Sequence, residues 1–231
     1  MDTVFSENKS TKANASLTGV FFIVAAVSSI IGLKLYDPIL TDNDFIISGS
    51  NNYNQIIFGA INELILAVTA TGTAIMLYPY LKRYNESLGM GYVSFRILEV
   101  FFILLGIISV LSVLAISQYY SANTITDKSH ATSLGLVFIA MHKWTFILGP
   151  NFMLAINTFL YSFVFRKTGL VPKKLSMLGI IASCLIMVAA LLEMFGIIEQ
   201  ISMWGILLAL PIALYEMSLA VWLIVKGFKV V

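Results

Sequence analysis

The sequence predicts an all-α integral membrane protein, built as a bundle of six membrane-crossing helices. Of its 231 residues, 59% are hydrophobic and 11% are charged, whereas soluble proteins have about 45–50% apolar and about 25% charged residues. Several apolar runs exceed the roughly 18 residues that a helix needs to cross a bilayer. Basic residues gather in the short turns between these runs. A soluble fold would have too few charged residues to cover so much apolar surface.

The charge and cysteine content exclude two classes of protein. The formal net charge is +2, and the basic residues lie in turns rather than along one stripe, so we expect no nucleic-acid partner. Cys184 is the one cysteine and lies inside an apolar run. An intrachain disulfide and a cysteine-based metal site are therefore excluded, and we interpret Cys184 as a packing residue.

The apolar runs define one transmembrane domain, predicted over residues 17–229. Residues 1–16 are polar, and we expect a cytoplasmic tail there. The first apolar run is longer than the core of a signal peptide and lacks a small-residue cleavage pattern, so we interpret it as a retained helix. The crossing helices are expected at about residues 17–35, 55–80, 88–118, 134–165, 175–197 and 203–225.

Two stretches are predicted to depart from regular helix. Residues 36–54 contain aspartates, a proline and a glycine, which predicts a polar loop. The fourth crossing contains Gly149-Pro150, and proline removes a backbone hydrogen bond inside a helix. We therefore expect that crossing to be broken there, with an outer piece at residues 134–148 and an inner piece at residues 151–165.

Lysines and arginines in short loops favour the cytoplasmic side of a membrane. Alternating the side of each turn gives one strongly basic side, while the opposite side receives Lys128 and Lys34. Both termini are therefore expected in the cytoplasm. The residues on the basic side are Lys9, Lys12, Lys82, Arg83, Arg166, Lys167, Lys173, Lys174, Lys226 and Lys229.

An inner layer of polar residues is predicted inside the bundle. At about 1.5 Å per residue, Arg96 and Glu99 lie roughly 12 and 16 Å from the basic side, and Glu216 lies roughly 15 Å deep. Asn157 falls at a similar level. An arginine between two carboxylates suits hydrocarbon, where unpaired charge is unfavourable. Either the cluster is a structural ion-pair network that fixes helix packing, or it has a conducting, binding or catalytic role.

An outer layer is predicted nearer the opposite surface, where Glu63 and Glu193 both lie roughly 27 Å from the basic side. Glu63, Glu193 and His142 could make a metal site such as a hydrolase would use. No HExxH-type spacing supports that site, and Lys143 is placed to neutralise the carboxylates, so we commit to no metal. The layer could equally be a proton or cation relay, or a set of ordinary interfacial salt bridges. Asn151 can reach the same level.

Further catalytic patterns are not found in the sequence. It has no Walker loop, no GxSxG and no dinucleotide-binding fingerprint. Its two histidines are too few to make bis-histidine haem ligation a reasonable expectation. We therefore expect no cofactor.

Four stretches resemble a bacterial multi-pass membrane family catalogued only as a domain of unknown function. They are LYPYLKRYNESLGMGYVSFRILE (77–99), HKWTFILGPNF (142–152), LVPKKLSMLGII (170–181) and ALPIALYEMSLAVWLIVKGFK (209–229). The resemblance implies a bacterial inner-membrane protein with no settled activity. It also implies recurrent polar positions, without a role for any of them, at Glu63, Arg96, Glu99, His142, Asn157 and Glu216.

The leading hypothesis is a membrane protein that binds or transports a small molecule or ion, with the lipid bilayer as its first partner. The Arg96, Glu99 and Glu216 cluster would gate or coordinate the ligand, and the broken fourth crossing and Pro211 would supply discontinuous helices. A second hypothesis is an integral-membrane enzyme that acts on a lipid or a small polar substrate at the outer layer. A third is a non-catalytic helper or sensor in which the buried charges only hold the helices together.

Overall fold

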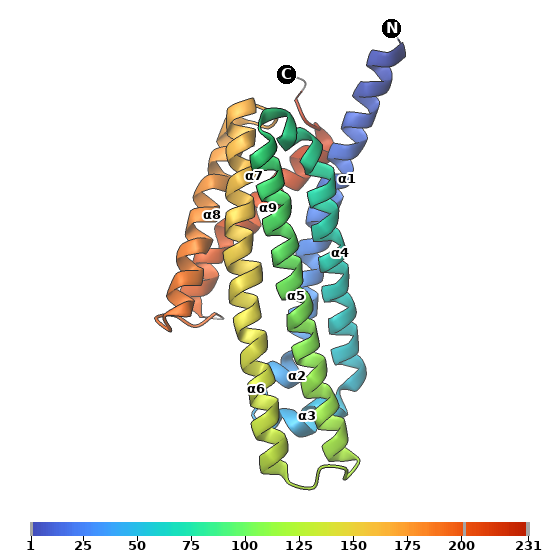
Figure 1. Ribbon diagram of the computed structural model, residues 1–231, viewed down its shortest axis with the longest axis vertical. Helices are drawn as coiled ribbons and strands as arrows, with labels where there is room; N and C mark the ends of the chain where they lie inside the picture. Colours follow the sequence, from blue (N-terminus) through green and yellow to red (C-terminus); the bar gives the residue numbers. More distant parts are fainter. Residues whose placement is uncertain (1, 201, 230–231) are drawn as a thin grey trace.

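A computed structural model describes residues 2–200 and 202–229, and for residues 2–11 it describes the backbone alone. This part of the chain is helical and contains no strand (Figure 1). Its elements are, in order, α1 (Asp2–Leu35), α2 (Asp37–Leu40), α3 (Phe45–Asn51), α4 (Tyr53–Tyr84), α5 (Glu86–Ser121), α6 (Lys128–Phe146), the π-helical turn η1 (Ile147–Met153), α7 (Leu154–Thr168), α8 (Lys173–Met194) and α9 (Met203–Val225).

Six helical segments within the described residues are long and apolar enough to cross a bilayer. They are α1 from Lys12, α4, α5, the continuous segment α6–η1–α7, α8 and α9. Side chains fix where some of them begin. Asn85 accepts a hydrogen bond from the backbone N–H of Leu88 at the start of α5, and Ser202 accepts one from Gly205 at the start of α9. The chain is a multi-pass membrane protein with an all-α fold, as predicted.

The six spans form a closed ring. Each of the neighbouring pairs α1–α4, α4–α5, α5–α7, α7–α8, α8–α9 and α9–α1 is in contact. The two ends of the described chain lie at the same end of the bundle, and α4, α5 and α6 extend well past α8 and α9 at the opposite end (Figure 1). Polar side chains inside the ring, such as those of Arg96 and Asn157, can therefore reach partners on other helices.

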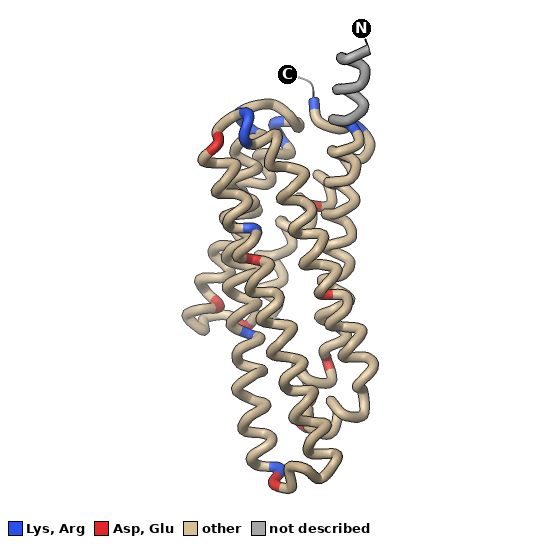
Figure 2. Tube along the Cα trace, turned by 45° about the vertical axis from the view of Figure 1, so that its right-hand side comes forward, with Lys and Arg blue, Asp and Glu red and all other residues tan. Residues whose placement is uncertain are grey.

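The charged residues are distributed unevenly along the bundle (Figure 2). Lysine and arginine gather at the end where the chain begins and finishes, which we call the basic end, and acidic residues lie along the middle of the bundle. The basic end contains the α4–α5 and α7–α8 connections and the end of α9 (Figure 1), where the sequence has Lys82, Arg83, Arg166, Lys167, Lys173, Lys174, Lys226 and Lys229. This asymmetry has the form that the positive-inside rule describes.

The loop expected between the first two crossings is largely helical. α2 and α3 form in it because Pro38 suits the first turn of a helix and because Asp42 accepts hydrogen bonds from Ser48 Oγ and the backbone N–H of Asp44. The hydroxyl of Ser117 in α5 donates to the backbone carbonyl of Ile46, which fixes α3 against the bundle. α2 and α3 therefore form a small cap at the end opposite the basic end.

The stretch expected as a cytoplasmic tail is helical from Asp2, because α1 continues without interruption into its apolar part. Two further expectations need correction. The fourth crossing is not broken at Gly149-Pro150. The helix widens into the π turn η1 there, which accommodates the proline ring and its missing N–H while the chain continues into α7. Cys184 of α8 does not pack in the interior but is exposed on the outside of the bundle.

Candidate functional site

The inner layer is centred on an ion pair within α5. Arg96 and Glu99 are three residues apart and so project from one face of the helix. Arg96 Nη1 donates to both carboxylate oxygens of Glu99, at 3.2 Å to Oε1 and 2.9 Å to Oε2. The two residues are 3% and 4% exposed. The pair is therefore enclosed by the bundle rather than facing lipid.

The rest of the Arg96 guanidinium binds α4. Its Nε donates to the backbone carbonyl of Ala70 at 3.3 Å and to Thr73 Oγ1 at 3.2 Å. The guanidinium carbon also lies 6.0 Å from the centre of the Phe22 ring of α1, which is within cation–π range. Arg96 thus holds α1, α4 and α5 together around one charge.

Glu99 extends the cluster to α7. The side-chain amide of Asn157 donates to Glu99 Oε2, the oxygen that also accepts the shorter bond from Arg96. Asn157 is fully buried. The structure therefore brings Arg96, Glu99 and Asn157 into one hydrogen-bonded network.

Glu216 of α9 belongs to the same region but is bonded differently. Within the described part of the chain, its Oε1 is buried and has no hydrogen-bond partner. It interacts electrostatically with Arg96 and Glu99, yet no ion pair within 4.0 Å joins it to Arg96 among these residues. One arginine and two glutamates give the cluster a formal charge of −1 when both carboxylates are ionised.

Three buried tyrosines surround this cluster, and the sequence interpretation did not select them. Tyr92, Tyr161 and Tyr215 are fully buried. The ring of Tyr161 lies 5.6 Å from that of Tyr92 and 6.0 Å from that of Tyr215. Tyr92 precedes Arg96 by four residues, and Tyr161 follows Asn157 by four. That spacing on a common helix face could have identified Tyr92 and Tyr161 from the sequence.

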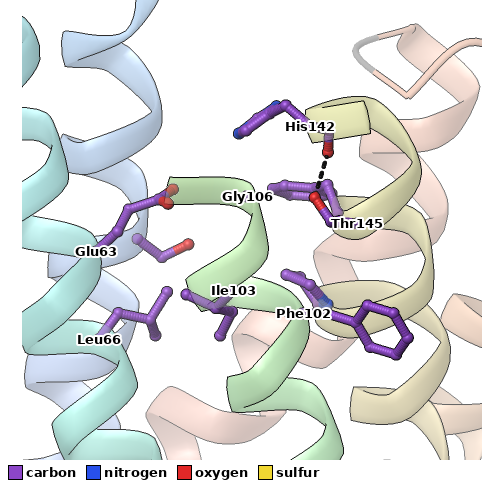
Figure 3. A pocket seen from close by; sticks show the side chains of 10 residues that line it. Glu63, Leu66, Phe102, Ile103, Gly106, His142 and Thr145 are labelled. Atoms are coloured by element: carbon purple, nitrogen blue, oxygen red, sulfur yellow. Dashed lines mark hydrogen bonds between the residues drawn. The ribbon is translucent and has the colours of Figure 1, made fainter. Parts of the chain in front are cut away.

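The outer layer separates into two groups. In the first, Glu63 of α4 and His142 of α6 line one small cavity of about 20 Å³, beside Gly106 of α5 (Figure 3). Glu63 and His142 are both 6% exposed. Ser29 and Thr145 add hydroxyl groups to the lining.

In the second group, Glu193 of α8 accepts a hydrogen bond from Asn151 Nδ2 of η1 at 2.8 Å. Lys143 is exposed but interacts electrostatically with Glu193. Glu193 does not line the cavity of Glu63 and His142. Over residues 2–200 and 202–229, no three His, Cys, Asp or Glu side chains are placed to hold a metal ion, so the three-ligand arrangement of Glu63, Glu193 and His142 is not formed.

The π turn η1 lies between the inner and outer groups. A Cβ on Gly149 would be 2.6 Å from Phe102 Cβ and 3.2 Å from the backbone oxygen of Glu99, so only glycine lets η1 approach α5 this closely. Pro150 lines the outer cavity, and Asn151 binds Glu193. The irregular turn therefore touches the inner cluster through the Glu99 backbone and both groups of the outer layer.

Comparison with known proteins identifies one family. A family described as a domain of unknown function, DUF4386, matches residues 17–227. No curated protein and no solved structure matches the chain.

Proposed function

The chain belongs to the DUF4386 family, a domain of unknown function, and we propose that it binds and transports a small cation, with the proton as the simplest case. The binding site is the inner cluster of Arg96, Glu99, Asn157 and Glu216. A bacterial inner membrane with both termini in the cytoplasm is part of the proposal. The basic end supports this orientation through the positive-inside rule.

The carboxylate of Glu216 is the observation that carries the proposal. Its buried Oε1 has no hydrogen-bond partner in the described part of the chain, although buried polar groups are normally paired. Arg96 is already bonded to Glu99, Ala70 and Thr73. The cluster therefore has one negative charge in excess, which a proton or small cation at Glu216 would neutralise.

The helices around Glu216 and Glu99 have the irregularities that transporters use at binding sites. Pro211 lies inside α9, five residues before Glu216, and has no N–H to donate to the preceding turn. The π turn η1 packs directly on the backbone of Glu99. Irregular turns within continuous helices, close to buried charge, leave backbone groups free to bind an ion and give points where a helix can bend.

The test is cation flux in proteoliposomes. Purified protein is reconstituted, and proton, Na⁺ and K⁺ movement is followed with ion-sensitive dyes under an imposed gradient. Wild type should conduct at least one of these cations above empty vesicles, and Glu216→Gln should abolish that flux while its thermal unfolding stays cooperative. Glu86→Gln is the control, since Glu86 is exposed and pairs only with Lys82 at 3.4 Å.

Two results would overturn the proposal. One is wild-type flux no greater than that of empty vesicles for all three cations. The second is Glu216→Gln that conducts like wild type, which would leave the cluster as a structural ion-pair network.

A further inference from the structure

The cavity between α4 and α6 is lined by two buried titratable side chains, Glu63 and His142, that are not part of the inner cluster. Glu63 and His142 come from helices on opposite sides of α5, and both side chains are directed into this cavity (Figure 3). Thr145 Oγ1 donates to the backbone carbonyl of His142 at 2.8 Å. Within the described residues, neither the Glu63 carboxylate nor the His142 ring has a protein hydrogen-bond partner.

The size of the cavity limits what can occupy it. Its volume of about 20 Å³ is enough for one water molecule, which needs roughly 10–15 Å³ measured in this way and two to four polar partners. The lining supplies those partners in Glu63, His142, Ser29 and Thr145.

Gly106 preserves this space. A Cβ at this position would lie 3.2 Å from Thr145 Oγ1 and 3.6 Å from His142 Cδ2. Any side chain on this turn of α5 would therefore crowd the hydroxyl and the imidazole ring.

We propose that Glu63 and His142 form a proton-binding site in which a single water molecule joins the two side chains. In the transfer step the O–H bond of the Glu63 carboxylic acid breaks and its proton binds the water oxygen. The water passes one of its own protons to a ring nitrogen of His142. The products are a carboxylate and an imidazolium, so the net charge is unchanged and no oxidant or reductant takes part.

The remaining titratable groups around the cavity are few. Tyr36 approaches His142 edge-on, with ring centroids 6.0 Å apart at 89°, and interacts electrostatically with Glu63. On α1, Lys34 is exposed and paired with Asp37. On α5 the nearest charged residues are Glu99 and Arg96, which are bonded to each other. Lys143 follows His142 but is exposed, and η1 has no titratable residue. The site therefore does not depend on the inner cluster or on the proposed transport.

The test uses the fact that the chain has only two histidines. His130 is exposed and pairs with Asp127, so His130→Asn leaves His142 as the single histidine. In this background, ¹⁵N-histidine NMR in lipid nanodiscs reports the ring nitrogens of His142, and difference infrared spectroscopy reports the carboxyl band of Glu63.

The proposal predicts reciprocal effects. Glu63→Gln should shift the ¹⁵N signals of His142, and His142→Gln should shift the carboxyl band that Glu63→Gln removes. Glu193→Gln, which changes an outer carboxylate outside the cavity, should change neither signal. Gly106→Ala should weaken both couplings by crowding the water, whereas Gly91→Ala should not, because its Cβ would meet only Leu160 Cδ1 at 3.6 Å.

The outcomes are decisive whether or not transport is found. If the His142 signals are the same in Glu63→Gln and the Glu63 band is the same in His142→Gln, the shared proton site is ruled out. Coupling that survives unchanged in Gly106→Ala would rule out the bridging water. The effect of each substitution is measured on the signal of the other residue of the pair. If one variant fails to fold, the other variant still gives a measurement.

Discussion

Asn157 and Arg96 donate hydrogen bonds to the same oxygen of Glu99, and together they join α7 and α5 at the centre of the bundle. Each donor comes from a helix that also contacts another part of the ring. The stability of the inner cluster therefore depends on both donors, and the two can be removed separately.

Asn157→Leu is expected to destabilise the protein by about 1–3 kcal/mol, because a buried carboxylate oxygen loses one of its two donors. Thermal unfolding in detergent measures the change. Asn62→Leu is the matched control, since the Asn62 amide binds only the Phe58 carbonyl of its own helix, on an exposed face. Equal losses of stability in the two variants would show that the hydrogen bond from Asn157 to Glu99 contributes no more than a bond within one helix.

Arg96→Met should lower the free energy of unfolding further, by about 3–5 kcal/mol relative to wild type. It leaves Glu99 as a buried charge without its counter-ion. Adding Glu99→Leu should recover part of that loss, since the unpaired charge is then removed as well. Chemical unfolding of the single and double variants gives the coupling energy. If the double variant is as unstable as the sum of the singles, the two side chains are energetically independent.

Gly149→Ala tests the close packing of η1 on α5. The new methyl group would be 2.6 Å from Phe102 Cβ and 3.2 Å from the Glu99 backbone oxygen, and we expect a loss of about 1–3 kcal/mol from overpacking. Gly91→Ala should be neutral or stabilising, because it adds a methyl group at ordinary contact distance and favours the helix. Unfolding midpoints that are equal in the two variants would contradict this packing.

The cap at the end opposite the basic end should respond to acid. Hydrogen bonds from the Ser48 hydroxyl and from the backbone N–H of Asp44 lower the pKa of Asp42 below its ordinary value of 3.8. Because the folded pKa is the lower one, this contribution to stability is fully present above pH 3.8 and is lost as the pH falls through the folded pKa.

Hydrogen exchange of the α3 amides, compared between neutral and strongly acidic pH, measures this effect. Asp42→Asn should already exchange faster at neutral pH and should lose the acid response. An α3 segment that exchanges at the wild-type rate in Asp42→Asn would show that another contact holds the cap.

Residue counting predicts which residues of different helices lie at the same level of the bundle better than it predicts which neighbouring helix each side chain faces. The spacing of Arg96 and Glu99 predicts a shared face, and residue counting places Asn157 at their level. Both expectations agree with the observed hydrogen bonds. The same counting places Glu63 and Glu193 at one depth and His142 nearer the outer surface, but depth does not determine which way a side chain faces. Glu193 binds Asn151 instead of sharing the cavity.

The partners of Arg96 on α4 show the same limit. Ala70 binds through its backbone and Thr73 through a short hydroxyl, and neither stands out in an apolar run. The two residues can be identified as partners of Arg96 only from the packing of α4 against α5. The Gly149-Pro150 pair correctly predicts an irregular turn. The pair alone does not determine whether the helix breaks or widens into a π turn, because that depends on packing against the neighbouring helices.

The position of Arg96 and Glu99 in one helix has a consequence for how the protein is made. The two charges are three residues apart and can bind each other as soon as α5 is helical, before any neighbouring span is in place. We therefore expect α5 to enter the bilayer as a span whose two buried charges cancel. α9 contains no basic residue that could pair with Glu216. Because α9 is synthesised after the five preceding spans, Glu216 comes near Arg96 only when the ring closes. We therefore expect membrane insertion of α5 to proceed without its neighbours, whereas that of α9 should be coupled to assembly.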